Sequence, residues 1–427
     1  MDGGWAAVAI SAAAILVRVW IGLSVHSPGT DLRSDMANYD RVAQHLSHGL
    51  QSVPDTFHPV GYPALLAVVY RLTDRSFGAV AIVQSLLGGA TCLLVWALTK
   101  QMAGSDTGAL AAETAVAFYP PLIYYGSMLL TESVAPFCLT LAVWLLLRTL
   151  RRPTGIGAAA TGTALAVATL VRPNFLLLYP FIVLMAWCVH RPDVRKGLRV
   201  AGQIRAWSVP LLALVAANNS LLNGRLTGLS TNGGVNFFLM QADVQGLTFY
   251  DEWLRPVRNA RYSTMLSSPV PFTDEPYFYK RGAREFLARR DKVGHTLTNV
   301  AEGFGLGLQG YWPANEILSP EDSSATGNDW IHRALRLCSE GFFWVVILPT
   351  LLGVAWVGLR RPRFRRLEIQ SLLAASIVIV LVVTFTVFLA DPRVHVPFDP
   401  ILIACLAATF SRSTREIRIK QGPDEVH

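Results

Sequence analysis

Residues 78–99 read GAVAIVQSLLGGATCLLVWALT, an apolar run without a single charged side chain. A helix rises about 1.5 Å per residue, so a run of this length crosses a hydrocarbon core of about 30 Å. Further apolar runs of similar length lie at 5–25, 108–127, 131–149, 155–171, 174–190, 205–222, 341–359, 368–389 and 395–411. The pattern predicts an all-α polytopic membrane protein with about ten transmembrane helices.

The composition agrees with lipid as the main solvent. Of the 427 residues, 52% are hydrophobic and only 15% are charged, too few to cover a soluble globule of this size. The net charge of +8 comes from short clusters between apolar runs, which favours membrane lipids over nucleic acid as the partner of these charges. The five cysteines lie mostly inside apolar runs and show no disulfide framework or metal-ligand spacing.

The basic clusters predict the orientation, because short cytoplasmic loops collect Lys and Arg. With the N-terminus inside, the cytoplasmic side receives Lys100 and the clusters at 148–152, 191–199, 360–366 and 412–420. We therefore expect three parts: an N-terminal transmembrane module (1–222) with a first outer loop (26–77), a large outer loop (223–340), and C-terminal helices with a cytoplasmic tail (341–427). The apolar stretch 61–72 is too short to span and is expected to dip into the membrane or lie along its surface.

The first outer loop holds the most interesting acid. It reads TDLRSDMANYD over residues 30–40, followed by an amphipathic stretch to Leu50. An acid held at the membrane surface can serve as general base toward a hydroxyl, and Asp35 is the candidate. The residues alone leave open that Asp31, Asp35 and Asp40 are solvated acids or helix N-caps.

Five short motifs resemble those of polyprenyl-phosphate-dependent GT-C glycosyltransferases, which include the protein O-mannosyltransferase and aminoarabinose transferase relatives. They are DMANY at 35–39 with HPVGYP at 58–63, LTES at 130–133, LVRPN at 170–174, TNGGVNF at 231–237 and DPRVHVP at 391–397. The resemblance implies a GT-C fold with interfacial helices on its outer loops. It also implies transfer of a sugar from a polyprenyl-phosphate donor to a lipid, glycan or protein acceptor, usually with inversion, at the outer face of a plasma membrane.

The resemblance also implies roles for single residues. Asp35 is expected to be the base or the carboxylate that orients the acceptor. Arg172 and Arg393, each beside a proline at an outer helix end, are expected to bind the leaving phosphate, with Lys280 in a basic, aromatic segment as a further cation. For these cations the alternatives are snorkelling and contact with lipid headgroups.

The expected substrate-binding side chains come from three of these five motifs. Aromatic residues and histidine are also ordinary at a membrane interface, and the TNGGVNF stretch is equally a plain turn. For Glu132 the alternatives are an ion pair with Arg172 or Arg393, a metal ligand and a helix cap. The expected residues are Tyr39, His58, Tyr62, Glu132, Asn232 and Asn236.

One departure from the family concerns a second acid. Met36 follows Asp35 where several relatives have Asp-Glu, so that role is open to Asp31, Asp40 or Glu132. No metal site is predicted, and no cofactor is required, although a divalent metal is left open because such ions prefer several oxygen ligands.

Three other functions compete with this interpretation. A transporter or flippase of lipid-linked sugars needs ionisable groups midway through the spans, and only Arg18 and Glu113 lie near such positions. A ligase of the O-antigen type would use a diphosphate-linked donor and depend on arginine and histidine. An oligosaccharyltransferase is less favoured, because the chain has no Trp-Trp-Asp-Tyr-Gly motif and no large soluble C-terminal domain.

Overall fold

The computed structural model describes residues 3–30, 32, 34–191, 193–242, 249–250, 255–256, 272–306, 334, 337–338, 340–353, 369–388 and 390–421. The predicted basic cluster at 360–366 and a large part of the predicted outer loop, mainly 257–271 and 307–333, lie outside these residues. The principal helices are α1 (Gly3–Trp20), α2 (Ser34–Ser47), α3 (Gly61–Thr73), α4 (Phe77–Ala103), α5 (Asp106–Ala117), α6 (Pro120–Gly126), α7 (Ala135–Arg151), α8 (Gly155–Val171), α9 (Tyr179–Val189), α10 (Val194–Asn223), α11 (Gly233–Ala242), α13 (Glu275–Ala288), α14 (Lys292–Gly303), α18 (Ile369–Val387) and α19 (Asp399–Gln421).

Short helical turns and one small ladder complete the described structure. The turns are η1 (Ile21–Val25), η2 (Val53–Thr56), η3 (Thr131–Ser133), η4 (Pro173–Leu178), η6 (Phe343–Ile347), η8 (Pro392–Val394) and η9 (Val396–Phe398). Strands β1 (Phe249–Tyr250) and β2 (Arg255–Pro256) pair antiparallel, with Phe249 opposite Pro256.

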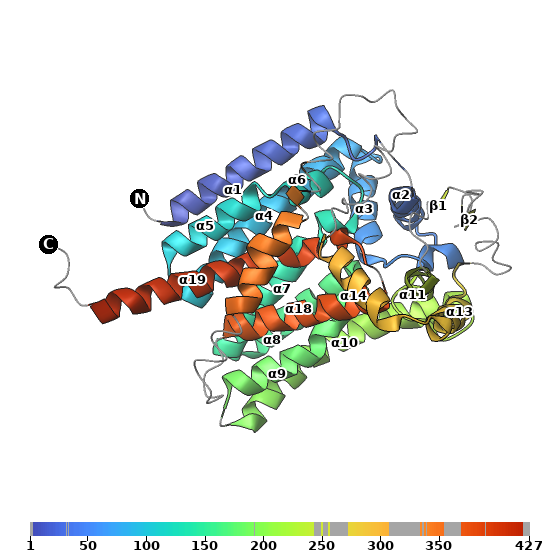
Figure 1. Ribbon diagram of the computed structural model, residues 1–427. Coiled ribbons are helices and arrows are strands. Elements are labelled where there is room, and N and C mark those ends of the chain that lie inside the picture. The colour runs from blue at the N-terminus through green and yellow to red at the C-terminus, as the bar shows by residue number, and fades with distance from the viewer. Residues whose placement is uncertain are drawn as a thin grey trace.

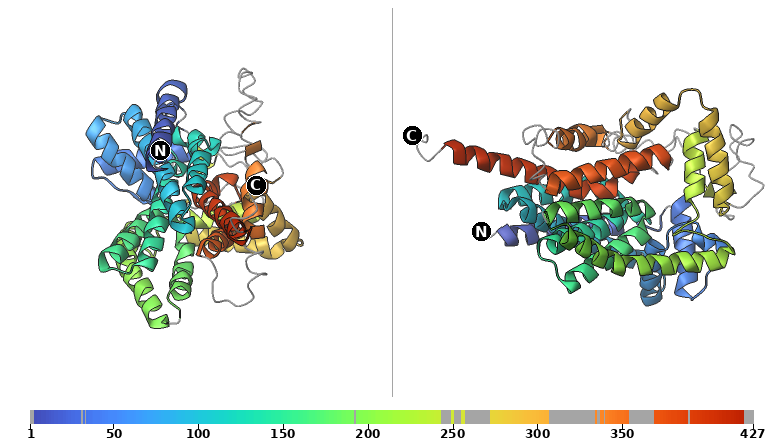
Figure 2. Two further views of the ribbon diagram at one scale, coloured as in Figure 1. Left: turned by 90° about the vertical axis from the view of Figure 1, so that its left-hand side faces the viewer. Right: turned by 90° about the horizontal axis from the view of Figure 1, so that it is seen from below.

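The long helices run along one another, and the chain ends share one end of the bundle. Figure 1 shows the N- and C-terminal marks at the left, whereas α2, α11 and α13 lie at the opposite end, where α2 and α13 are seen nearly end-on. The right-hand view of Figure 2 separates the same two ends. The helices of the outer loops therefore lie crosswise at the end away from the termini, as interfacial helices would.

The membrane-spanning character expected from the sequence is confirmed. Among the described residues, five helices are long and apolar enough to cross a membrane: Gly3–Val25, Phe77–Ala103, Val194–Asn223, Ile369–Val387 and Pro392–Ser411. Shorter apolar helices at Gly155–Val171, Pro173–Val189 and Glu340–Gly353 fall at further predicted spans. The protein is a polytopic helical membrane protein.

One predicted span is divided in the structure. The run 108–127 forms α5 and α6, and the backbone between them turns at Phe118 and Tyr119. Pro120 and Pro121 follow this turn, and a proline cannot donate the helical hydrogen bond and clashes with the preceding turn. α5 therefore ends where an apolar pattern alone predicts continuation.

Buried polar groups join the helices inside the bundle. Nη1 of Arg18, on α1, donates to the carbonyl oxygens of Ala117 at 2.9 Å and Ala14 at 3.1 Å. Ala117 is the last residue of α5, so the guanidinium lies at the negative end of that helix dipole. The hydroxyl of Ser11 donates to Oε1 of Glu113 at 2.8 Å. The two ionisable groups near mid-span therefore have partners that connect α1 to α5.

Gln84, on α4, also connects several helical segments through hydrogen bonds. Its Oε1 accepts hydrogen bonds from the hydroxyls of Tyr62 at 2.6 Å and Ser133 at 2.9 Å. Its Nε2 donates to the carbonyl oxygens of Gly126 at 3.0 Å and Met128 at 3.1 Å. A fully buried amide with both ends bonded fixes α3, α4 and the segment after α6 together.

The first outer loop is fastened to the outer helices by a small apolar cluster separate from the main core. Phe57 packs there with four residues of the outer segments, namely Val235, Phe238, Phe272 and Phe278. The backbone N–H of Thr231 also donates to the carbonyl oxygen of Thr56 at 2.9 Å. The residue preceding His58 is thereby held by α11 and α13.

Candidate functional site

Charged side chains from four separate segments meet near the end of the bundle that carries α2. Asp35 is in the first turn of α2, and Glu132 is in η3. Arg172 is the C-cap of α8, where Pro173 ends the helix, and Arg393 is in η8 after Pro392. The structure thus brings together the predicted acid and both arginines predicted to bind phosphate.

Arg393 and His58 hold the carboxylate of Asp35. Nη1 of Arg393 donates a hydrogen bond of 3.0 Å to Oδ2, and Nε2 of His58 lies 3.4 Å from Oδ1. The Asp35 side chain is only 14% exposed and that of Arg393 is 16% exposed. This pair is therefore shielded from water, where an ion pair is stronger than at a free surface.

Glu132 connects the two arginines. Its Oε1 accepts a hydrogen bond of 2.9 Å from Nη2 of Arg172 and lies 4.0 Å from Nε of Arg393. Oε2 accepts a hydrogen bond of 3.0 Å from the hydroxyl of Thr131. At 1% exposure, Glu132 is a buried charge whose partners are the guanidinium groups, whereas Nη1 of Arg172 is buried with no hydrogen-bond partner among the described residues.

Asp391 is a further acid of the site, which the sequence motif contained but which we did not single out. Its Oδ1 accepts a hydrogen bond of 2.8 Å from the backbone N–H of Arg393, and Oδ2 lies 3.7 Å from Nε of the same arginine. An aspartate two residues before a cation, followed by proline, is a turn-forming pattern that indicates this contact. Asp391 thus fixes the turn that presents Arg393.

The environments of the site acids differ in their effect on proton affinity. Burial alone would raise the pKa of Asp35, but Arg393 and His58 hold it well below the ordinary value. Burial raises the pKa of Asp391, with Arg393 acting in the opposite direction. Burial, with the charges of Asp35 and Glu132, also raises the pKa of Tyr39. Asp35 is therefore ionised, and in this arrangement it is a weak base.

The aromatic residues predicted to bind substrate lie beside Asp35. The ring of Tyr39 is 4.7 Å from that of His58 and 5.3 Å from that of Tyr62, measured between centroids. Tyr62 is fully buried, however, and its hydroxyl donates to Gln84. A substrate contact by Tyr62 stays a prediction, and the contacts seen are those of a packing residue.

A close backbone contact sets the distance between two of these segments. A Cβ atom on Gly61 would lie 2.6 Å from the backbone carbon of Leu170 and from the nitrogen of Val171. α3 therefore approaches the end of α8 as only a glycine allows. His58 and Arg172 flank this contact in their own segments, so it helps to position both.

The remaining predicted residues lie on the outer helices. Asn232 immediately precedes α11 and Asn236 lies in its first turn, where the backbone N–H of Asn236 donates to the carbonyl oxygen of Asn232 at 2.9 Å, and Lys280 is exposed on α13. A Cβ on Gly234 would lie 2.4 Å from the carbonyl oxygen of Glu275, so this glycine allows α11 to pack closely on α13. Within the described chain, no hydrogen bond or ion pair links the three predicted residues to Asp35 or Arg393, and their substrate contacts stay predictions.

Asp40, another candidate for the second carboxylate, has structural partners. Asp40 accepts hydrogen bonds from the hydroxyl of Tyr70 at 2.8 Å and from Nη2 of Arg75 at 2.8 Å, which ties α2 to the end of α3. Asp31 lies outside the described residues. Of the two candidates that the structure describes, Glu132 is the one within 4.0 Å of Arg393.

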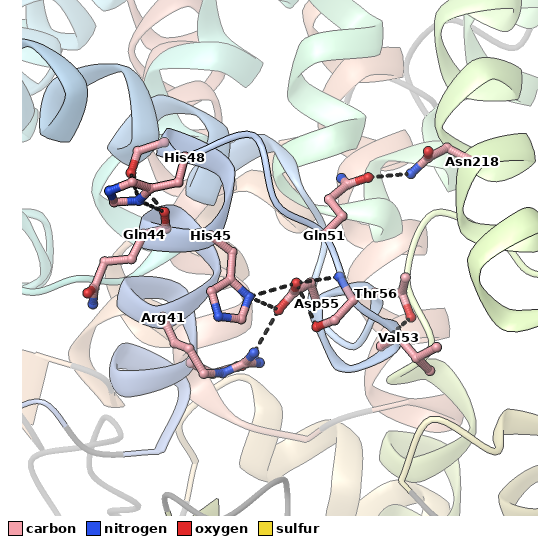
Figure 3. A network of polar contacts seen from close by, with 12 residues as sticks. Arg41, Gln44, His45, His48, Gln51, Val53, Asp55, Thr56 and Asn218 are labelled. Atoms are coloured by element: carbon pink, nitrogen blue, oxygen red, sulfur yellow. Dashed lines mark hydrogen bonds and ion pairs between the residues drawn. The ribbon is translucent and has the colours of Figure 1, made fainter.

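Asp55 forms a separate network beside the site (Figure 3). Its carboxylate lies 2.7 Å from Nη1 of Arg41 and 2.9 Å from Nδ1 of His45, and it accepts from the backbone N–H of Ser52 at 2.7 Å. Burial alone would raise the pKa of Asp55, but hydrogen bonds from His45 and Ser52 and the charge of Arg41 lower it. This network fastens the turn before His58 to α2.

No group of three or more His, Cys, Asp or Glu side chains is arranged to hold a metal ion in the part of the chain that the structure describes. The acids nearest one another, Asp35, Glu132 and Asp391, are instead arranged around the guanidinium of Arg393.

Comparison with known proteins agrees with this architecture. Residues 57–218 match the family model described as dolichyl-phosphate-mannose-protein mannosyltransferase. The apo crystal structure of the Archaeoglobus fulgidus oligosaccharyltransferase superposes with a TM-score of 0.55 at 13% identity, over 97% of this chain and 51% of that one. The AglB structure from the same organism, with an inhibitory peptide and a dolichol-phosphate, gives 0.54 at 12% identity over the same shares. The chain shares the fold of these oligosaccharyltransferase structures, which is the GT-C fold.

Two further comparisons limit the conclusion to the fold. ArnT from Cupriavidus metallidurans bound to undecaprenyl phosphate superposes with a TM-score of 0.39 at 13% identity, over 97% of this chain and 79% of that one, a score too low to support an argument. No curated protein matches the sequence. The chain spans about half the length of the A. fulgidus oligosaccharyltransferase, and the likeness at this identity concerns the fold. The GT-C fold predicted from the motifs is confirmed.

Proposed function

We propose that this protein is a membrane glycosyltransferase that transfers a sugar from a polyprenyl-phosphate donor to a lipid, glycan or protein acceptor. The observation that carries the proposal is the Asp35–Arg393 pair, joined through Glu132 to Arg172, in a chain with the GT-C fold. A carboxylate beside two guanidinium groups supplies what this chemistry needs, namely a group for the acceptor hydroxyl and cations for the leaving phosphate.

The reaction can be written on these residues. The acceptor hydroxyl oxygen attacks the anomeric carbon, and the bond from that carbon to the phosphate oxygen breaks, so the electron pair leaves with polyprenyl phosphate. Arg172 and Arg393 neutralise the charge that grows on the phosphate. Asp35 takes the hydroxyl proton or, for an acceptor that is already ionised, orients it. Attack from the face opposite the phosphate inverts the anomeric centre.

Other predicted residues have supporting roles in this proposal. Tyr39 and His58 lie against Asp35 and would line the acceptor side of the site. Lys280, Asn232 and Asn236 lie on the crosswise outer helices, from which they would contact substrate from the water side.

The proposed location is the plasma membrane, with both termini in the cytoplasm and the site on the opposite side. Its support is the end of the bundle shared by the two termini (Figure 1), together with basic residues at cytoplasmic positions such as Lys100 and Arg151. The carboxylate network lies toward α2, at the other end.

The test is turnover of a panel of polyprenyl-phosphate sugars by the purified protein in lipid, with Asp35→Asn beside the wild type. Asp106→Asn is the matched control, because it makes the same charge change in an exposed pair with Lys100 beside the N-terminal end of α1. We expect the wild type and the control to release free polyprenyl phosphate and Asp35→Asn to release none above background. No release by the wild type from any donor would count against the proposal and favour a diphosphate-linked donor or a transporter.

A further inference from the structure

Three carboxylates surround the guanidinium of Arg393. Asp35, Asp391 and Glu132 all lie within 4.0 Å of its guanidinium nitrogens, and among the described residues Glu132 is the one that also pairs with a second guanidinium, that of Arg172. An anion that approaches Arg393 therefore meets carboxylates already in place. A phosphate that takes the Nη1 N–H that Asp35 accepts must displace this carboxylate.

We propose that Asp35 and the donor phosphate compete for Arg393, so that the donor binds first and frees Asp35 for the acceptor. This inference rests on the proposed function and specifies the order in which the donor and the acceptor bind. In the resting protein Asp35 acts as a latch on the phosphate site, and the latch opens only when a phosphate is present.

Of the three carboxylates, Asp35 is the one whose contact can exchange. Asp391 accepts from the backbone N–H of Arg393 and belongs to the same turn, so its departure would unmake the turn. Glu132 is held by Arg172 and Thr131 and is 1% exposed. Asp35 instead reaches Nη1 from another helix, by one hydrogen bond between side chains. Breaking that bond disturbs no backbone contact.

His58 supplies the second half of the exchange. Its Nε2 lies 3.4 Å from Oδ1 of Asp35, whereas the hydrogen bond from Arg393 goes to Oδ2. When Nη1 turns to the phosphate, His58 keeps the carboxylate in place, and the aromatic neighbours of His58, Tyr39 and Phe57, hold the imidazole. The acid is therefore released from the arginine without leaving the site.

The exchange also changes what Asp35 can do. With Arg393 on one oxygen, the carboxylate has a low proton affinity and is a poor base. When the phosphate takes the guanidinium, that opposing charge is neutralised and the proton affinity of Asp35 rises. The acceptor proton then passes to Asp35 as the bond between the anomeric carbon and the phosphate oxygen breaks. If the acceptor binds before the donor, Asp35 is still paired with Arg393 and is a poor base for the acceptor hydroxyl.

The experiment measures the affinity for polyprenyl monophosphate, the product of the proposed reaction, with no sugar transfer required. The proteins are the wild type, Asp35→Asn, Asp35→Glu and the control Asp106→Asn, all in nanodiscs and all checked for thermal unfolding. Removing the competing charge should make Asp35→Asn bind about tenfold tighter than wild type. Asp35→Glu, which keeps the charge, and Asp106→Asn should stay within about twofold of it.

A double-mutant cycle with Arg393→Ala keeps the test informative if Asp35→Asn is poorly folded alone. In the Arg393→Ala background the Asp35→Asn change should no longer tighten binding, because the group for which they compete is absent. Equal or weaker binding by folded Asp35→Asn overturns the latch. Absence of binding by every protein, wild type included, would instead count against the proposed donor class.

Discussion

Nη1 of Arg393 lies 3.0 Å from Oδ2 of Asp35, although 358 positions separate the two residues in the chain. The segment that matches the mannosyltransferase family model, residues 57–218, contains His58, Glu132 and Arg172 but neither member of this pair. The charge arrangement is completed by the first outer loop before that segment and by the last helices after it. A fragment limited to the matched segment would therefore lack the pair that we propose to be central.

Arg393→Lys tests whether any cation at this position supports sugar transfer, or whether the guanidinium geometry is required. A lysine ammonium is a point charge without the planar fork that can hold a carboxylate and a phosphate together. We expect the initial rate of polyprenyl phosphate release to fall by about 100-fold, the usual scale for loss of one charge-stabilising donor. Arg148→Lys, on α7 against Trp144, is the control and should keep its rate. If Arg393→Lys releases polyprenyl phosphate at the wild-type rate, the planar guanidinium is not required for transfer.

Glu132→Gln should destabilise the protein. The substitution keeps the shape but removes the one carboxylate that contacts both arginines, and unpairing a buried charge costs about 3 kcal/mol or more. Thermal unfolding in detergent should show a clear fall in midpoint, whereas Asp106→Asn, in an exposed pair, should cost less than about 1 kcal/mol. Equal midpoints for the two variants would show that the arginines do not depend on Glu132.

Tyr62→Phe and Gln84→Leu separate packing from substrate contact. Tyr62→Phe removes one hydrogen bond to Gln84, so we expect a loss of about 1 kcal/mol and turnover close to wild type. Gln84→Leu leaves two hydroxyls and two carbonyl oxygens without their partner and should cost several times more. A large loss of turnover in a stable Tyr62→Phe protein would instead support the predicted substrate contact.

The sequence predicted the parts of this structure that depend on local pattern. Apolar runs located the long helices, and charge placement with motif resemblance selected Asp35, Arg172 and Arg393. Their meeting is a tertiary contact, so no spacing rule could show that Glu132 lies between the two arginines. Gln84 was overlooked because one amide in an apolar helix leaves no periodic signal, although a polar residue at such a position is itself informative.

The division of the run 108–127 had a local cause that a hydropathy window averages away. Pro120 and Pro121 are visible in the sequence, but the flanking residues are apolar enough to hide the turn at Phe118 and Tyr119. The partners of Asp40 and Asp55 were also beyond prediction, since a loop acid gives no sign of the arginine it will meet.

Asp55→Asn should show a stability loss that depends on pH. The folded-state pKa of Asp55 is lowered, so its contribution is present above the ordinary carboxyl value of about 3.9 and is lost as pH falls through the folded value. We expect a cost of about 2 kcal/mol at pH 7, from hydrogen bonds to a charged group, and a shrinking difference from wild type below about pH 4. Unfolding midpoints of the wild type and of Asp55→Asn, measured from pH 3 to 8, give the pH dependence of this difference. A difference that stays constant over this range would assign the loss to shape and not to charge.

Gly61→Ala tests whether the spacing of α3 and α8 sets the site. The new Cβ would lie 2.6 Å from backbone atoms of Leu170 and Val171, which cannot rotate away as a side chain does, so one helix must shift. His58 and Arg172 adjoin this contact, and a displacement of about 1 Å at a reacting group can cost about 100-fold in rate. We expect turnover to fall by at least about tenfold. Gly155→Ala, at the start of α8 with nothing within 4 Å, should keep its rate. If Gly61→Ala unfolds at a lower temperature yet has normal turnover, the contact between α3 and α8 contributes to stability alone. In that case α3 moves away from α8 without displacing His58 or Arg172.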